Sequence, residues 1–530
     1  MKIGILDIVA LPARGGFESV VRMVLSKQFA AIMPQAVSVW CQQLGHRTHY
    51  ATYYGIGDPY DSLPHDLDIV FISTFTHASG LAYALAKLFR RDGALTVVGG
   101  PHAKSFATDC LRFFDLVVKE CNRALIADIV GGHYERGSIL SSPPPDEIPL
   151  VEERVREIKI AAFAHGRRYF MTTIPVLSSA GCPYDCNFCV DWDKPYRMFS
   201  RDQLVRDLRF IADRFPGAIA GFHDPNFAVR FDEVLGALEE LPAKLRPRYI
   251  AESSLSVVRD ARMTRLRDTR CVAMLAGVES WLDYSNKTGL GRRTVGIDKG
   301  RHVAEHFRAL HGHVPYLQAG MIFGLDTDMG DEPVELTCAF MEQTPFAWPT
   351  ISTPMPLAGT PVYDQYVTEG RLLPDLPFAF YFTCYLVATL KHYEPIDYFD
   401  SLIRLAEHAS SHRMLARRLA STTNWGVRAI HWARTVSARE DVRSYRRMRQ
   451  LLASDRGFLA YNRGESTVLP ELYHREFEAL HGRYAALLSR DDRRPVLEPR
   501  ADLHPLGRTG AQGRGAVRVA RPPEAGKQLA

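Results

Sequence analysis

Two long stretches of the sequence alternate short apolar runs with segments of helical periodicity, and this alternation limits the possible folds more than any other feature. In the first stretch, residues 1–135, periodic segments such as residues 80–93 separate the apolar runs. Strands that alternate with helices predict an α/β protein with a doubly wound parallel sheet. The candidate strands of this sheet are residues 2–9, 47–53, 67–73, 94–100 and 115–118.

The second stretch begins near residue 170 and contains six apolar runs separated by five helical segments. Ser200 and Gln203 have the spacing of a capping box at the start of the first helical segment. Six consecutive strand–helix units predict a partial (β/α)6 barrel, whose ligands bind at the carboxyl ends of the strands. The candidate strands of the barrel are residues 173–180, 218–222, 248–253, 272–280, 315–324 and 349–356.

The remaining segments divide the chain into five expected parts. Three consecutive prolines within residues 141–149 indicate a linker, because proline fits neither a helix interior nor a sheet interior. Beyond residue 370 the strand pattern is lost and a helical region follows; its aromatic entry, residues 377–386, either lines a pocket over the barrel or belongs to the core. The expected parts are an N-terminal domain at 1–140, a linker at 141–169, the barrel at 170–370, a helical region at 371–490 and a disordered tail at 491–530.

Composition argues against several classes of protein. The net charge is +5, and residues 491–530, with eight basic and five acidic residues, supply +3 of it, so the rest of the surface does not suit nucleic acid. No apolar run reaches the ~18 residues of a membrane-spanning helix, and the first residues lack a signal-peptide cleavage pattern. Six of the nine cysteines are scattered singly, which favours a reducing cytoplasm over a disulfide framework.

The other three cysteines, Cys182, Cys186 and Cys189, lie within eight positions directly after the first barrel strand. Thiolates select zinc, copper(I) or iron–sulfur clusters. Structural zinc usually needs a second pair of ligands at similar spacing, and the next forty residues contain none. A cubane cluster normally takes four thiolates, so three leave one iron open for a substrate or cofactor. Buried structural cysteines are not expected to gather on a polar loop in this way.

The spacing Cys-x3-Cys-x2-Cys, with the aromatic Phe188 before the last cysteine, resembles the signature of the radical S-adenosylmethionine (SAM) superfamily. The resemblance implies that Cys182, Cys186 and Cys189 hold a catalytic 4Fe-4S cluster whose open iron is chelated by the amino and carboxylate groups of SAM. An electron from the cluster, supplied by a partner such as flavodoxin or ferredoxin, then cleaves SAM to a 5′-deoxyadenosyl radical.

Acidic and amide side chains at other strand ends match further parts of this family. The resemblance assigns Asp224, supported by Asn226, to the amino group of SAM, and Glu252 to its ribose hydroxyls. Glu279 occupies a position that family members direct into the active site. The alternative for the three acids is that each caps the helix that follows it, or lies in a surface turn.

The N-terminal, Rossmann-like sheet resembles the cobalamin-binding domain that precedes the barrel in one radical SAM class. Ser73 and Phe75 end the third strand, where the family has an element that lines the nucleotide tail of cobalamin. Gly99, Gly100 and Pro101 end the fourth strand, where glycines allow a bound tail to approach closely.

Two features depart from that family pattern. The chain has Val9 and Pro12 after Asp7, where domains that supply an axial histidine have histidine and glycine. Residues 119–122, Lys-Glu-Cys-Asn, stand where many relatives have Gly-Glu-Gly-Glu. The alternative is a Rossmann-like domain that has lost its cofactor and only covers the barrel.

The resemblance as a whole implies a cobalamin-binding radical SAM enzyme that modifies a small metabolite, with C-methylation through methylcobalamin as the leading interpretation. Two alternatives stay open. The same architecture could perform radical ring closure or oxidation without net methyl transfer, or the chain could be a non-catalytic zinc-binding module. The mass of the product separates the first alternative from methylation, and the metal content excludes or supports the second.

Overall fold

The first alternating stretch forms a six-stranded parallel sheet with the strand order β2-β1-β3-β4-β5-β6. The order reverses between β1 and β3, which is the switch point where doubly wound sheets bind ligands. Asp7 on β1 lies opposite Ser73 on β3, and Ser73 lies opposite Gly99 on β4. The sixth strand was not predicted, because three residues are too few for a periodic pattern. The strands are β1 (Lys2–Ile8), β2 (Arg47–Tyr53), β3 (Ile69–Thr74), β4 (Leu95–Gly99), β5 (Leu116–Val118) and β6 (Ser138–Leu140).

The computed structural model describes residues 1–13, 15, 27, 30–164, 166–169, 171–259, 261–285, 287–291, 293–382 and 384–498. Helices cover both faces of the N-terminal sheet, as a doubly wound fold requires. Trp40 packs with Ile5 on one face, and Leu85 packs with Leu6 on the other. The helices are α2 (Ile32–Gln43), α3 (Ser79–Arg91), α4 (Gly100–Ser105), α5 (Ala107–Cys110) and α6 (Arg123–Val130), with a short 3-10 helix η2 (Thr76–Ala78).

The second stretch forms the predicted partial barrel, a parallel sheet with the order β14-β13-β12-β11-β10-β7 and helices on its outer side. The predicted first strand is split into β7 and β8, and β8 pairs with β9 in an antiparallel hairpin. The strands are β7 (Thr173–Val176), β8 (Ser179–Ala180), β9 (Arg197–Met198), β10 (Ile219–Phe222), β11 (Arg248–Ser254), β12 (Cys271–Glu279), β13 (Tyr316–Ile322) and β14 (Ala347–Ser352). The outer helices are α8 (Arg201–Arg214), α9 (Phe231–Glu239), α10 (Arg262–Asp268), α11 (Gly296–His311) and α12 (Glu332–Gln343).

The predicted capping box at the start of α8 is wrong. Ser200 is the residue before the helix, but its side chain accepts no capping hydrogen bond. The Gln203 amide instead donates to the carbonyl oxygen of Ile148 at 2.8 Å. A tertiary contact with the segment before the barrel therefore replaces the local bond that the spacing predicted.

The range predicted as a linker contains a helix, α7 (Val155–Ala162), that packs against the N-terminal domain. The buried Arg154 donates to Oε1 of Gln35 on α2 at 2.8 Å and to the carbonyl oxygen of Pro175 on β7 at 3.1 Å. Glu157 accepts hydrogen bonds from Ser38 and Gln42 of α2, both at 2.8 Å. These contacts fix the two sheets relative to each other.

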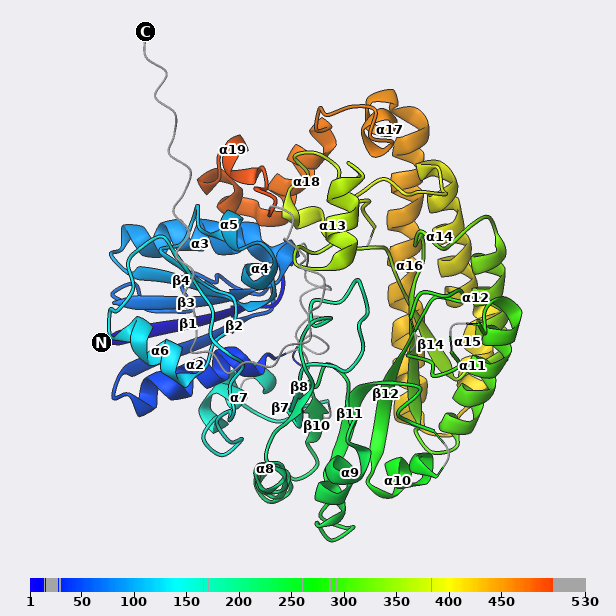
Figure 1. Ribbon diagram of the computed structural model, residues 1–530, viewed down its shortest axis with the longest axis horizontal. Helices are drawn as coiled ribbons and strands as arrows, with labels where there is room; N and C mark the ends of the chain where they lie inside the picture. The colour runs from blue at the N-terminus through cyan, green and yellow to red at the C-terminus, as the bar shows by residue number, and fades with distance from the viewer. Residues whose placement is uncertain are drawn as a thin grey trace, which may run out of the picture.

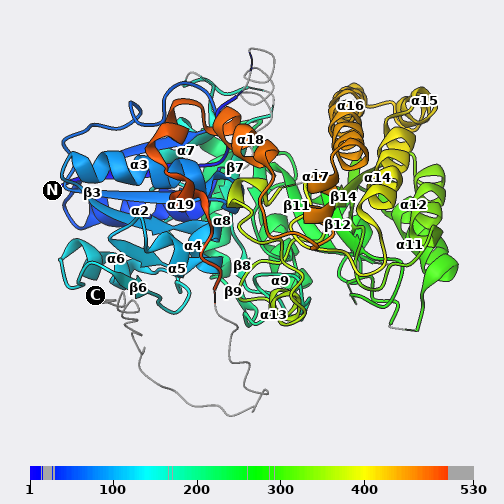
Figure 2. The same ribbon diagram turned by 90° about the horizontal axis from the view of Figure 1, so that it is seen from above.

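The C-terminal region is helical and joins the N-terminal domain to the barrel (Figures 1 and 2). Phe378, Phe380 and Tyr381 of its aromatic entry are core residues, whereas Phe382 is exposed. The range predicted as a tail starts with described residues, since Glu498 accepts a hydrogen bond from Thr108 Oγ1 of α5; the rest of that range, residues 499–530, lies outside the described residues. The helices are α13 (Pro361–Thr368), η3 (Phe378–Phe380), α14 (Pro395–Ser410), α15 (His412–Ala420), α16 (Trp425–Ser454), α17 (Arg456–Asn462), α18 (Glu471–His481), η4 (Gly482–Leu487) and α19 (Arg490–Arg493).

Within the described residues, none of these helices combines the length and the apolar character that a membrane crossing requires.

Candidate active site

The three predicted cluster ligands share one loop at the carboxyl end of the barrel's first strand. The hairpin of β8 and β9 closes this loop, which contains Cys182, Cys186 and Cys189 and is called the cluster loop (residues 181–196) below. Gly181 opens the loop with a φ of +71°, and a β-carbon at this position would collide with the carbonyl group of Pro195. Only glycine satisfies both conditions, so the backbone of the loop depends on it.

The three side chains are free thiols in the structure. Burial raises the pKa of Cys186 to about 11 and also raises the pKa of Cys189, so both are protonated until a metal displaces the proton. In the described part of the chain, no three or more His, Cys, Asp or Glu side chains converge as ligands of a single metal ion. The thiolates of a cubane do not all need to reach a single metal ion, because each binds a different iron of the cluster. The donor set therefore suits a cubane with one open iron.

An ion pair that the sequence did not reveal lies beside these thiols. Lys287 Nζ is 2.7 Å from Oε1 of Glu279, and both side chains are largely buried. Burial alone would lower the pKa of Lys287, but the Glu279 carboxylate, and the two cysteines once they are ionised, raise it above its ordinary value. The Nζ atom also lies 5.5 Å from the ring centroid of Phe188, within cation–π range. The cluster loop therefore has a permanent cation next to it.

An irregular end of β12 sets the direction of Glu279. The residue has a φ of +64°, and the register with β13 shifts between Gly277 and Glu279. A β-carbon at position 277 would collide with the Glu279 carboxylate. A residue other than glycine keeps a left-handed backbone conformation only where the surrounding structure holds it, and such residues are concentrated at functional sites. The sequence predicted Glu279 at a strand end, but only the structure places it against Lys287.

The Phe188 ring connects the cluster loop to the C-terminal region. It stacks on Tyr284 with ring centroids 5.5 Å apart, and it packs against the small buried cluster formed by Val362 and Tyr366 of α13 and by Ala388. Trp192 Nε1 donates to the carbonyl oxygen of Gly359 at 2.8 Å. The region after the barrel therefore supports the loop as well as covering the core.

Glu252 on β11 is electrostatically coupled to the Lys287–Glu279 pair. Water reaches its side chain, yet the surrounding protein desolvates the carboxyl group enough to raise its pKa. Lys287 opposes this rise and Glu279 adds to it. This combination is expected of a carboxyl group at the open mouth of a barrel, where protein surrounds it on most sides. Two of the predicted acidic residues thus gather around one lysine.

Asp224 and Asn226, the other two predicted SAM contacts, are bonded within the protein. Asp224 Oδ1 accepts hydrogen bonds from Ser178 Oγ and Ser179 Oγ, each at 2.5 Å. Burial raises the pKa of Asp224, and these serine bonds oppose the rise. Asn226 Oδ1 accepts from the backbone N–H of Ser254 at 3.0 Å. Both residues therefore brace the strand ends around the cluster loop, and a direct contact with SAM stays a prediction.

The alternative that the three acidic residues cap helices is wrong. The residues that precede α9, α10 and α11 are Arg230, Ala261 and Val295. Asp224, Glu252 and Glu279 come well before these positions. Asp224 lies two residues after β10, Glu252 lies within β11 and Glu279 is the last residue of β12.

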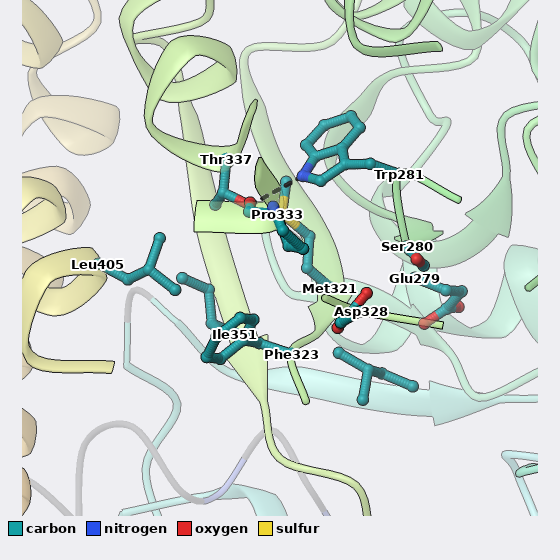
Figure 3. Close-up of a pocket in the computed structure, with 11 residues that line it drawn as sticks. Glu279, Ser280, Trp281, Met321, Phe323, Asp328, Pro333, Thr337, Ile351 and Leu405 are labelled. Atoms are coloured by element: carbon teal, nitrogen blue, oxygen red, sulfur yellow. Dashed lines mark hydrogen bonds between the residues drawn. The ribbon is translucent and has the colours of Figure 1, made fainter. Parts of the chain in front are cut away.

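A small pocket lies beside Glu279 at the ends of β12 and β13 (Figure 3). Asp328 and Leu405 of α14 contribute to its lining, and the Trp281 indole donates to Thr337 Oγ1 at 2.8 Å along one side. Desolvation raises the pKa of Asp328 to about 6, although the backbone N–H groups of the turn after β13 bond to it. This pocket extends the polar mouth of the barrel toward the C-terminal helices.

The N-terminal sheet brings its predicted cobalamin contacts to the switch point. Ser73 and Gly99 lie side by side at the ends of β3 and β4, Phe75 follows β3 and is half-buried, and Pro101 is exposed in the first turn of α4. Asp7 is buried next to Ser73, and its Oδ2 has no hydrogen-bond partner among the described residues. Burial raises the pKa of Asp7 to about 7.

The two glycines at the end of β4 differ in how much room a side chain would have. Gly100 has a φ of +87°, and a β-carbon there would lie 2.8 Å from Ser73 Oγ and 3.0 Å from the backbone nitrogen of Thr74. Its absent side chain is explained by packing within the protein. A β-carbon at Gly99 would have one neighbour within 4 Å, the carbonyl oxygen of Val118 at 3.7 Å. A side chain at position 99 would therefore meet no close neighbour, and a contact between Gly99 and cobalamin stays a prediction.

Comparisons with known proteins agree with this architecture. No family model matches the chain. The bacteriochlorophyllide d C-12(1)-methyltransferase of Chlorobaculum tepidum is 24% identical over 329 residues, which are 59% of this chain and 69% of that protein.

Two solved structures share the fold at low sequence identity. The radical SAM methyltransferase TsrM of Kitasatospora setae, solved with cobalamin and a 4Fe-4S cluster, superposes with a TM-score of 0.50 at 12% identity over 69% of this chain and 78% of that chain. The cobalamin-dependent radical SAM enzyme OxsB, solved with aqua-cobalamin, gives a TM-score of 0.54 at 12% identity over 93% of this chain and 77% of that chain. The alignment with OxsB includes both sheets and the C-terminal helices because it covers nearly the whole chain. The chain thus combines a three-cysteine loop at the barrel mouth with a fold similar to those of cobalamin-dependent radical SAM enzymes.

Proposed function

We propose that this protein is a cobalamin-binding radical SAM enzyme that methylates a carbon atom of a small metabolite. The observation that carries the proposal is the cluster loop itself: three free thiols at the carboxyl end of a barrel strand, next to a buried lysine–glutamate pair. The similarity to a methyltransferase and the fold shared with TsrM and OxsB support the reaction class.

In this proposal Cys182, Cys186 and Cys189 would hold the 4Fe-4S cluster, which would leave one iron open for SAM. When bound, the cluster supplies the electron that splits SAM into methionine and a 5′-deoxyadenosyl radical, and cobalamin supplies the methyl group. Lys287 and Glu279 are the charged groups available to the carboxylate and amino groups of SAM, because opposite charges attract strongly where water is excluded.

The remaining polar residues have orienting roles. Glu252 is the accessible carboxylate next to the Lys287–Glu279 pair and can accept hydrogen bonds from ribose hydroxyls. Asp224, through Ser178 and Ser179, holds the segment that leads into the cluster loop. At the N-terminal switch point, Ser73, Phe75 and Gly99 are the residues proposed to contact the tail of cobalamin. A flavodoxin or ferredoxin of a reducing cytoplasm would supply the electron.

The proposal is tested by purifying the protein without oxygen in the presence of hydroxocobalamin, then measuring its absorbance spectrum and metal content. We expect a brown protein with about four irons per chain and one bound cobalamin. One zinc per chain, no iron and no colour would contradict the proposal. Product masses would then distinguish methylation, which adds one CH2 unit, from radical cyclisation or oxidation on the same scaffold.

A further inference from the structure

A lysine of the N-terminal domain reaches directly into the cluster loop of the barrel. Lys104 lies on α4, four positions after Gly100. Its Nζ is 2.8 Å from Oδ1 of Asp191 in the cluster loop and 3.0 Å from Oε1 of Glu120, which follows β5. The side chains are 21%, 25% and 29% exposed, so this triad is partly shielded from water and its charges are screened less than those of a surface pair.

Asp191 is also bonded to a proposed cluster ligand. Its backbone N–H donates to Cys189 Sγ with a nitrogen–sulfur distance of 3.5 Å. Hydrogen bonds to the cysteine sulfurs are among the factors that set the reduction potential of an iron–sulfur cluster. A shift of Asp191 would therefore change the hydrogen bond to Cys189 Sγ while the set of proposed iron ligands stays the same.

The other end of α4 belongs to the proposed cobalamin site. The helix begins at Gly100, whose Cα approaches the end of β3 so closely that a β-carbon would meet Ser73 Oγ at 2.8 Å. A group bound over Gly99 would therefore lie against the first turn of the helix that carries Lys104. Gly99 and Lys104 are separated by about one and a half helical turns. Lys104 pairs with Asp191, which bonds to Cys189, so this short helix lies between the switch point and a proposed cluster ligand.

We propose that Lys104 is a positioning residue that couples occupancy of the cobalamin site to the conformation of the cluster loop through its ion pair with Asp191. The inference rests on the proposed function, because it presumes that both cofactors bind. It adds a means by which one domain responds to the cofactor of the other. Coupling of this kind requires a physical connection that both sites bias, and the triad provides one.

The test uses the cluster-loaded full-length protein, with hydroxocobalamin as the probe and hydrogen–deuterium exchange of residues 182–194 as the readout. In the wild type, hydroxocobalamin should slow exchange of the amides after Cys189 by about fivefold. In Lys104→Met, hydroxocobalamin should still bind but the slowing should be lost, and Lys104→Arg should restore it. Lys87→Met is the matched control, because Lys87 pairs with Asp492 at 2.7 Å, also across an interdomain contact but far from the cluster loop in the sequence.

The outcomes separate the inference from the proposed function. If wild-type protein binds no hydroxocobalamin, the proposed function fails and the inference fails with it. If hydroxocobalamin binds and Lys104→Met shows the same slowing as the wild type, only the inference is overturned. Equal loss of slowing in Lys104→Met and Lys87→Met would also overturn it, because the effect would then belong to domain packing in general.

Discussion

The two parallel sheets of this chain present different chemistry at their carboxyl ends. The N-terminal sheet ends in glycines, hydroxyl groups and one buried carboxyl group, Asp7, whose pKa burial raises to about 7. The barrel ends in three thiols, the ion pair of Lys287 and Glu279, and the accessible Glu252. The same architecture therefore places few charges at the switch point of the N-terminal sheet and several at the carboxyl ends of the barrel strands.

This difference indicates how each site would select its ligand. A charged ligand such as SAM is held by opposite charges and by iron, so removing one group should have a large effect. A large ligand held over glycines is selected by shape, so adding a side chain should matter more than removing a charge.

The largest effect is expected for Cys186→Ala. With two thiolates left, the cubane loses one of its protein ligands, and iron binding and SAM cleavage should both be abolished. Iron content and 5′-deoxyadenosine formation measure this directly. Cys338→Ala, which changes a partly buried cysteine on α12 outside the cluster loop, should retain both. Full iron content in Cys186→Ala would contradict the ligand assignment.

The next largest effect is expected for Lys287→Met. Removing one partner of a buried ion pair leaves Glu279 as an uncompensated charge, which should lower the free energy of unfolding by about 3 kcal/mol. Chemical denaturation of the protein without cofactors measures it. Arg301→Met, which breaks the exposed pair of Arg301 and Asp298, should cost less than about 1 kcal/mol. Equal costs in the two variants would mean that the pair beside the cluster loop is not shielded from water.

The two glycines that end β4 should respond differently to alanine. Gly100→Ala forces a side chain into left-handed backbone against Ser73 and should destabilise the protein by about 2 kcal/mol. Gly99→Ala meets no close neighbour and should leave stability nearly unchanged. Gly99→Leu should then weaken hydroxocobalamin binding while iron content stays normal. Unchanged cobalamin affinity in that variant would remove Gly99 from the proposed tail site.

The smallest effect concerns Asp7 and pH. Its folded-state pKa, about 7, lies above the ordinary value of 3.8, so folding favours the protonated form and the wild type loses stability as pH rises between these values. Between pH 6 and pH 7 this loss should amount to about 1 kcal/mol. Asp7→Asn should lack it, so urea denaturation at the two pH values should show the variant gaining on the wild type. Parallel curves would indicate that Asp7 is ionised in the folded protein.

Much of the fold could be predicted because its strands are buried in parallel sheets and therefore appear as apolar runs. The short strand β6 and the helix α7 were missed, since three residues carry no period and a proline-rich segment precedes the helix. The expected capping box at Ser200 failed because Gln203 finds a tertiary partner instead. Local spacing predicts local bonds, and it cannot weigh them against contacts made by distant segments.

In the candidate site, too, residues in a local motif could be found from the sequence, and residues that act through distant contacts could not. The three cysteines could be proposed as ligands because their spacing is local, whereas Lys287 and Lys104 belong to no motif and became visible only through their partners Glu279 and Asp191. Asp224 shows the opposite case, since its place at a strand end suggested a ligand contact and the structure gives its carboxylate two serine partners. Position at a strand end predicts proximity to the site, but not which atoms a side chain bonds.

The proposed reaction depends most on the open iron of a cluster held by three cysteines. The direct measurement is 5′-deoxyadenosine formed when protein reconstituted with iron and sulfide is given SAM and dithionite in the absence of oxygen. The account predicts that deoxyadenosine forms in the wild type and is absent from Cys186→Ala. A wild-type protein that carries about four irons yet yields no deoxyadenosine would contradict it.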